Sequence, residues 1–486
     1  MNRPTRTGAS HAAALLLLAA VPAVLAAQAV DRTRPPALGP APALRVPPVQ
    51  TMTLPNGLLL AVVEMHKVPV VDVTLMIDAG AVADPADLPG LASFTATMLR
   101  EGAGRRAALE IAEETDFLGA RLNASASFDG ATVTLHVPKR QLGPALDLMA
   151  DVVLRPAFAD SEITRQRDLR RTQILQQRDQ PVAMAGLAFP AIVFGAQHPY
   201  GRAMGGTEAS TALLSRDRVS QFYQTYYRPG AAKLLVVGDI TLAEAQQLVT
   251  ARFGAWERGT APPAAPAAAP AALMARTIYL VDKPGAAQSV IRIGNVGVPR
   301  SSDEYFPLQV MNTILGGSFT SRLNQNLRET HGYTYGASAQ LAMRRMAGPY
   351  VAGAASVQSA KTDSSLIEFM RELRRIRDEA VPQAELDKAK AYIALGLPGD
   401  FETTQGAAGQ FRTLLEFGLP LDYYSSYVAH INAVTAADVQ RVARQYLDLD
   451  HFAIVVVGDR SVIEAGIRAL NEGPISIRDL WGQEIH

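Results

Sequence analysis

The chain has 486 residues, 48% of them hydrophobic and 19% charged, and its 46 lysines and arginines are balanced by 46 aspartates and glutamates. A neutral chain offers no basic field to nucleic acid, so we expect no nucleic-acid partner. The sequence contains no cysteine, which excludes thiolate metal ligands and cysteine nucleophiles, and its length favours more than one domain.

The N-terminus predicts export. Arg3 and Arg6 precede an apolar run over residues 12–26, a pattern typical of a secretory signal peptide, which we assign to residues 1–27. We therefore expect a periplasmic protein with no stable membrane span after cleavage, and an uncleaved anchor is the alternative. Residues 28–50 are rich in proline and alanine without hydrophobic periodicity, which predicts an extended or disordered extension.

Residues 51–258 predict a first lobe that mixes strands and helices. The turn pair Asp129-Gly130 predicts a hairpin, and the second helix of the lobe is expected to count Leu109 and Phe117 among its apolar positions. Hairpins mixed with helices predict the α+β class. The strands are expected over residues 58–63, 70–77, 120–127 and 131–138, and the helices over residues 90–99, 106–118, 142–153 and 161–177.

A proline- and alanine-rich segment divides the chain after this lobe. Residues 259–275 predict a semi-rigid spacer, followed by a second lobe over residues 276–474 and a tail over residues 475–486. Residues 219–239 and 439–459 each combine a helix with an apolar strand that ends in Gly-Asp. We interpret this repeat as an internal duplication that makes the two lobes homologous.

The helix expected over residues 90–99 resembles the metal-binding helix of the pitrilysin (insulinase-like, inverzincin) zinc peptidases. In that family the helix carries the motif H-x-x-E-H, whose histidines bind zinc and whose glutamate polarises the attacking water. The resemblance places Ser93, Ala96 and Thr97 at these positions, and it places Gln173 where the family has a third ligand, a glutamate on a later helix. Serine and threonine are poor zinc ligands, alanine cannot accept a proton and glutamine is neutral, so we expect no metal site here.

The positions of the histidines also predict that this chain has no metal site, independently of the family resemblance. The chain has eight histidines, and nowhere are two of them four residues apart, the spacing that would place both on one helical face. No pattern in the sequence predicts a zinc site assembled from residues that are distant along the chain. We therefore interpret each histidine as a surface or core residue.

The second half keeps a different part of the family pattern. Residues 315–323 and 327–335 resemble the segment G-G-x-x-x-S-R-L followed by L-R-E-x-x-G-x-x-Y, whose arginine and tyrosine contact the substrate backbone and the developing oxyanion. The resemblance assigns these roles to Arg328 and Tyr335, acting in trans on a partner's zinc site. The alternative is that Arg328 serves its helix end and Tyr335 packs on a strand.

Residues 121–127 also resemble the family, in which the matching edge strand pairs with an extended substrate. The resemblance assigns peptide binding to Asn123, Ala124 and Ser125, and an ordinary sheet strand is the alternative. The family-like loop over residues 198–201 is expected to serve packing and turn formation.

The resemblance implies two homologous lobes, each a mixed, largely antiparallel sheet with helices on one face, forming half of a clamshell chamber. It further implies a non-catalytic, substrate-binding subunit of a heterodimeric zinc peptidase that hydrolyses short or unfolded peptides. The zinc and the intact H-x-x-E-H motif would belong to a homologous partner, and this chain would hold no cofactor. The alternative is a peptide-binding or scaffold pseudopeptidase of the cell envelope. A hydrolase with another site is disfavoured, because the sequence has no cysteine, no clustered histidines and no convincing nucleophile elbow.

Overall fold

The computed structural model of the chain describes residues 45–259, 261, 269–270 and 273–485. The expected signal peptide, most of the expected N-terminal extension and most of the linker lie outside these residues. The strands are β1 (Gln50–Thr53), β2 (Leu59–Glu64), β3 (Val70–Ile77), β4 (Arg121–Ala126), β5 (Ala131–Pro138), β6 (Ala232–Gly238), β7 (Thr277–Asp282), β8 (Gln288–Val296), β9 (Ala337–Leu341), β10 (Pro349–Gln358), β11 (Ala453–Gly458) and β12 (Ile475–Arg478).

The helices match the expected positions closely in the first lobe. The four expected over 90–99, 106–118, 142–153 and 161–177 are α2, α3, α4 and α5. The first lobe contains α2 (Leu91–Met98), α3 (Ala108–Phe117), α4 (Leu142–Leu154), α5 (Asp160–Gln177), α6 (Pro181–Phe194), α7 (Glu208–Ala212), α8 (Arg216–Tyr226) and α9 (Leu242–Phe253). The second contains α10 (Tyr305–Asn312), the π-helical turns η5 (Thr313–Gly317) and η6 (Gln325–Thr330), α11 (Arg322–Asn324), α12 (Thr362–Asp378), α13 (Gln383–Asp400), α14 (Thr404–Phe417), α15 (Tyr423–Ala433), α16 (Ala436–Tyr446) and α17 (Arg460–Ala469).

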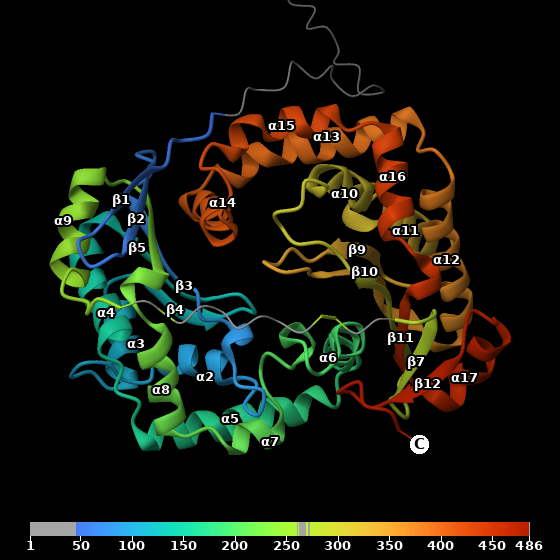
Figure 1. Cartoon of the computed structure of the whole chain (residues 1–486), viewed down its shortest axis with the longest axis horizontal. Helices are drawn as coiled ribbons and strands as arrows, with labels where there is room; N and C mark the ends of the chain where they lie inside the picture. The colour runs from blue at the N-terminus through green and yellow to red at the C-terminus, as the bar shows by residue number, and fades with distance from the viewer. Residues whose placement is uncertain (1–44, 260, 262–268, 271–272, 486) are drawn as a thin grey trace, which may run out of the picture. The chain divides into compact units, whose positions relative to one another are not determined.

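Two six-stranded sheets organise these elements (Figure 1), and five strands of each follow one topology, whereas the sixth strands, β1 and β12, differ in direction and in their place in the chain. The first has the order β1-β2-β6-β3-β5-β4 and the second the order β12-β7-β11-β8-β10-β9. In the first sheet only β2 and β6 run parallel, and in the second β7 is parallel to both β11 and β12. The expected α+β class with two homologous, largely antiparallel lobes is therefore confirmed.

The sequence suggested a separate tail over residues 475–486, but the structure places part of this segment in the second sheet. Strand β12 pairs in parallel with β7 and takes the edge position that β1 takes in the first sheet. Its Ile475 and Ile477 pack against the core of the second lobe, which explains why this short segment joins the sheet. The second lobe is thus completed by the C-terminal residues.

The apolar strands β6 and β11 are buried on both faces, because alternate residues belong to different cores. In β6, Leu234 and Val236 face the helices of the first lobe, whereas Leu235 and Val237 face the opposite side. In β11, Val455 and Val457 likewise lie in a cluster separate from that of Ile454 and Val456. The near-continuous apolar runs in these strands are the sequence signature of such double burial.

Each sheet receives a helix from the other lobe on its second face. Helix α14, from the second lobe, packs on β3 and β6, and α6, from the first lobe, packs on β8 and β11 (Figure 1). Phe411 and Leu414 of α14 are fully buried, and Phe189 and Val193 of α6 are at most 2% exposed. The lobes are therefore joined by a reciprocal exchange of helices.

The loop over residues 198–201 closes a second contact between the lobes. The Tyr200 hydroxyl donates a hydrogen bond to Oδ1 of Asp129 over 2.5 Å and accepts one from the backbone N–H of Met346 over 3.2 Å. The backbone N–H of Arg345 donates to Oδ2 of Asp129 over 3.0 Å. Burial raises the pKa of Tyr200 above its ordinary value, so the hydroxyl stays a donor. The packing and turn role expected for this loop is confirmed.

Candidate functional site

Helix α2 carries the three positions at which the zinc peptidases have their metal-binding motif. The helix begins after Gly90, whose φ of 95° lies in the left-handed region. The buried Asp84 carboxylate accepts hydrogen bonds of 2.7 Å from the backbone N–H groups of Gly90 and Ala92, and so holds the first turn. Ser93 and Thr97 follow one turn apart on one face, as the motif spacing requires.

A guanidinium group occupies the neighbourhood of the first of these positions. Arg170, on α5, donates hydrogen bonds to the Ser93 hydroxyl over 3.2 Å and to the carbonyl oxygen of Gly90 over 3.1 Å. Its guanidinium carbon also lies 5.1 Å from the ring centroid of Phe94. Burial lowers the pKa of Arg170 to about 10, so the group remains charged at neutral pH.

The other three positions offer no metal ligand either. The Thr97 hydroxyl donates to the backbone carbonyl of Ser93 over 3.0 Å, Ala96 is buried without a polar atom, and Gln173 is exposed. Zinc is held by imidazole, thiolate or carboxylate groups. The side chains of Ser93, Ala96, Thr97 and Gln173 contain none of these groups, and the Arg170 cation lies beside Ser93. The residues present therefore do not fit zinc. Within residues 45–485, as far as the structure describes them, no three His, Cys, Asp or Glu side chains are grouped so as to hold a metal ion.

The edge strand β4 lies beside this helix. Asn123 and Ala124 line a cavity of about 710 Å³ together with Thr97 from α2 and Leu109 from α3. The Asn123 side-chain oxygen lies 3.4 Å from a guanidinium nitrogen of Arg100. Ser125 lies away from this cavity and lines a smaller hollow of about 130 Å³. The structure therefore brings Thr97, Asn123 and Ala124 together and leaves Ser125 apart.

Helix α3 contributes to the cavity in a way that the sequence analysis missed. Leu109 and Phe117, expected among the apolar positions of the helix, are 68% and 84% exposed. The helix instead buries Ile111 and Thr115. Its exposed Leu109 gives the cavity beside β4 an apolar wall, which periodicity alone could not show because α3 is only weakly amphipathic.

Charged residues close the opposite side of the cavity. Glu101 forms an ion pair with Arg165 and accepts a hydrogen bond of 2.7 Å from the Gln166 side chain. Burial raises the pKa of Glu101 above its ordinary value. Neither Glu101 nor Arg165 belongs to a local motif, so only the spatial contact between α2 and α5 reveals them.

Arg328 and Tyr335 lie together in the second lobe. The Arg328 guanidinium carbon is 5.7 Å from the ring centroid of Tyr335 and 4.5 Å from that of Phe319. Tyr335 is 87% exposed and Phe319 65% exposed, whereas the Arg328 side chain is 29% exposed and has a weak contact of 3.5 Å to Glu329. Tyr335 therefore does not pack within its sheet. Phe319 is the member of this group that sequence reasoning overlooked.

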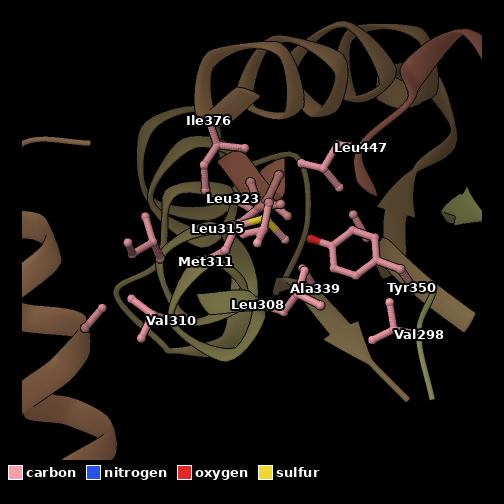
Figure 2. Close-up of a cluster of buried hydrophobic side chains, with 14 of the residues drawn as sticks. Val298, Leu308, Val310, Met311, Leu315, Leu323, Ala339, Tyr350, Ile376 and Leu447 are labelled. Carbon is pink, nitrogen blue, oxygen red and sulfur yellow. The ribbon is translucent and has the colours of Figure 1, made fainter. Parts of the chain in front are cut away.

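The Gly-Gly pair before this group has a steric cause. A Cβ atom on Gly316 would lie 2.1 Å from the backbone nitrogen of Ala339, so η5 approaches β9 more closely than any side chain allows. Figure 2 shows the core beneath, with Leu315 and Leu323 gathered beside Met311 and Tyr350. In addition, Arg322 forms a buried two-pronged ion pair with Glu385, with N···O distances of 2.8 and 2.7 Å. These contacts fix the segment that carries Arg328.

Comparisons with known proteins agree with this architecture. The model of the insulinase family (peptidase family M16) matches residues 59–207, and the model of the peptidase M16 inactive domain matches residues 213–393. Together they span more than half of the chain. The chain belongs to the insulinase family. The first match contains α2 and α5, and the second contains Arg328 and Tyr335.

Individual members of the family resemble the chain over most of its length. An uncharacterized zinc protease of Mycobacterium leprae is 28% identical over 83% of this chain and 90% of that protein. A probable mitochondrial-processing peptidase subunit beta of Arabidopsis thaliana is 24% identical, over 85% of this chain and 79% of that protein.

Among solved structures, a peptidase M16 inactive domain from Pseudomonas fluorescens superimposes with a TM-score of 0.79 at 26% identity, covering 85% of this chain and 98% of that one. A protease from Helicobacter pylori has the same TM-score at 20% identity and supports the fold alone.

These findings confirm the insulinase-like family and its two-lobed fold. The roles expected for Arg328, Tyr335, Asn123, Ala124 and Ser125 stay predictions, as do the zinc-bearing partner, the cofactor assignment and the periplasmic location. In the part of the chain that the structure describes, no helix combines the length and the apolarity needed to cross a membrane.

Proposed function

We propose that this insulinase-family chain is the non-catalytic, substrate-binding subunit of a heterodimeric zinc peptidase. The observation that carries the proposal is the contact between Arg170 and Ser93, which puts a partly buried cation beside the first ligand position. A homologous partner would supply the intact H-x-x-E-H motif and the zinc. The segment over residues 1–27 supports a periplasmic location, which cell fractionation would test.

Arg328 and Tyr335 are the residues that this subunit would supply in trans. Tyr335 is exposed and the Arg328 side chain is 29% exposed, so both groups are accessible to a second chain or a substrate, and the neighbouring rings of Phe319 and Tyr335 restrict the orientation of the guanidinium. A planar cationic donor and a hydroxyl donor suit a peptide carbonyl that develops negative charge.

Strand β4 is the surface that would bind the peptide. It is the outermost strand of the first sheet, so its outer edge is available for pairing with an extended chain. Asn123 and Ala124 sit where this edge meets the cavity beside α2. This arrangement also favours the second candidate function, a pseudopeptidase that binds peptides without any catalytic role, because binding at an edge needs no metal.

Reconstitution tests the catalytic proposal. The chain is co-expressed with the homologous protein that carries the intact motif, and the complex is assayed on a quenched fluorescent peptide. Arg328→Ala and Tyr335→Phe are each expected to lower kcat about 10²–10³-fold, the cost typical of one lost oxyanion donor. The matched controls are Arg468→Ala and Tyr392→Phe, which alter exposed residues elsewhere in the second lobe.

The outcomes separate the candidates. Full activity of the Arg328 and Tyr335 variants would show that the role in trans is wrong and would favour the pseudopeptidase. Stoichiometric zinc binding and peptide cleavage by the purified chain alone would contradict both candidates.

A further inference from the structure

The face of the first sheet that looks toward α14 carries a row of charged side chains across three strands. Asp72 of β3 is the register partner of His136 of β5, and His136 is the register partner of Arg121 of β4. Because cross-strand partners share a face, these three groups line up from the sheet interior to its edge. The next row on the same face is Thr74, Thr134 and Asn123.

Helix α14 leaves room above these rows. Its Gln405, Ala408, Gly409 and Arg412 follow the spacing of one helical face, and the two central residues are too small to fill the gap. The result is a cavity of about 400 Å³ between the helix and the rows of β3, β5 and β4. It lies outside the cavity beside α2, although Asn123 lines both.

The charges of this cavity are not balanced. At the inner end of the row, Oδ1 of Asp72 lies 2.9 Å from Nδ1 of His136, whereas Oδ2 of Asp72 is buried without a hydrogen-bond partner among the described residues. Arg121 is exposed at the outer end and has no ion pair among the residues that the structure describes. Arg412 has only a 3.9 Å contact with Glu416, and its Nε is buried without a hydrogen-bond partner. Two arginines therefore line the cavity together with one carboxylate, that of Asp72.

A peptide paired with the edge of β4 would reach this cavity. Side chains of a strand point alternately to the two faces of its sheet, so every second residue of the added strand would lie on the face of Arg121 and Asn123. The edge residue Asn123 lines the cavity directly. Such side chains would approach the two guanidinium groups, whose planar donors match a carboxylate.

We propose that this cavity is a specificity pocket for acidic side chains, Asp or Glu, at alternate positions of a peptide bound along β4. Arg121 and Arg412 contact the incoming carboxylate, and His136 separates it from Asp72. The inference rests on the proposed peptide binding, and it names a substrate class for it.

Direct binding measurements test this specificity without any catalysis. Two short fluorescein-labelled peptides are compared by fluorescence anisotropy, one with Glu at every second position and one with Gln there. The Glu peptide is expected to bind the full chain about tenfold more tightly, a difference of about 1.4 kcal/mol, because charge-assisted hydrogen bonds are stronger than neutral ones. The double variant Arg121→Gln/Arg412→Gln is expected to bind both peptides equally, whereas Arg468→Gln keeps the preference.

Arg412→Lys guards against a folding defect, because it keeps the charge and is expected to retain most of the preference. Equal binding of both peptides to the unaltered chain overturns the acidic pocket and leaves peptide binding intact. A preference that survives the double variant also overturns the pocket. Binding of neither peptide overturns both the pocket and the proposed peptide-binding function.

Discussion

Arg170 donates a hydrogen bond to the Ser93 hydroxyl over 3.2 Å, so a protein cation stands beside the position at which zinc peptidases of the insulinase family place their first ligand. The contact connects α5 to α2, the two helices that would have to supply a metal site together. The site thus differs from a zinc site in two ways: four side chains are replaced, and a guanidinium lies beside the first ligand position.

Restoring the four family residues alone is therefore expected to give only weak zinc binding. In the variant Ser93→His/Ala96→Glu/Thr97→His/Gln173→Glu, the partly buried Arg170 charge repels the metal ion. Adding Arg170→Met is expected to raise the zinc affinity at least about tenfold, since like charges a few ångströms apart cost on the order of a few kcal/mol. Competition with a chromogenic chelator measures both affinities, and equal values would show that Arg170 does not oppose the metal.

Asp84 is expected to make the stability of the first lobe depend on pH. Burial raises the pKa of this carboxyl to about 7 against the opposing effect of two backbone N–H donors, Arg202 and Arg170. The folded state therefore binds a proton that the unfolded state, with a pKa of about 4, has released. The contribution is fully present below about pH 4 and is lost as pH rises to about 7, by on the order of 2–4 kcal/mol.

Urea unfolding at several pH values between 4 and 8 checks this dependence. Asp84→Asn is expected to flatten the decline in the free energy of unfolding, whereas Asp87→Asn, a change at an exposed carboxyl, leaves it unaltered. Identical slopes for the Asp84 variant and the unaltered chain would contradict the assignment.

The ion pair between Arg322 and Glu385 is expected to stabilise the segment that carries Arg328. The Arg322 side chain is only 4% exposed, so Glu385→Gln would leave its charge without a partner in a poorly solvated place. A loss of about 2–4 kcal/mol in the free energy of unfolding is expected. Asp378→Asn, which removes a more exposed partner of Arg377, is expected to cost no more than about 1 kcal/mol, and a similar cost for both variants would contradict the difference in burial.

The exchanged helices are expected to hold the lobes together after the linker is cut. A protease site inserted within residues 259–275 should yield two fragments that elute together in gel filtration, because α6 and α14 remain buried in the opposite lobe. Phe411→Asp, which places a charge in a fully buried position, should weaken this association, whereas a change at the exposed Leu421 should not. Separation of the cut but otherwise unaltered fragments would show that the linker, and not the exchange, joins the lobes.

Local patterns in the sequence predicted much of the fold. The ranges expected for the strands over 70–77 and 131–138 coincide with β3 and β5, because alternation and turn residues act over short distances. The expected tail failed because β12 is held by pairing with β7, a partner nearly two hundred residues away. The helix exchange could likewise not be predicted from local patterns, because α6 and α14 pack on strands of the other lobe.

The candidate site, like the fold, was predicted only where the signal is local in the sequence. Ser93, Ala96, Thr97, Gln173, Arg328 and Tyr335 were found because motif spacing is a local property. Arg170 was missed because its role depends on the distance from α5 to α2, and Phe319 was missed because a lone aromatic residue carries no pattern. The row from Asp72 to Arg121 appears only when strands from separate parts of the sequence are placed in register.

The exchange of α6 and α14 also sets the order in which the protein can mature as the chain emerges during the proposed export. The first sheet can form once β6 and α9 have emerged, but its second face stays uncovered until α14 ends at Phe417, about 160 residues later. Throughout this interval Met76, Leu235 and Val237 present an apolar surface to the surroundings, so the emerging first lobe is a natural client for a chaperone.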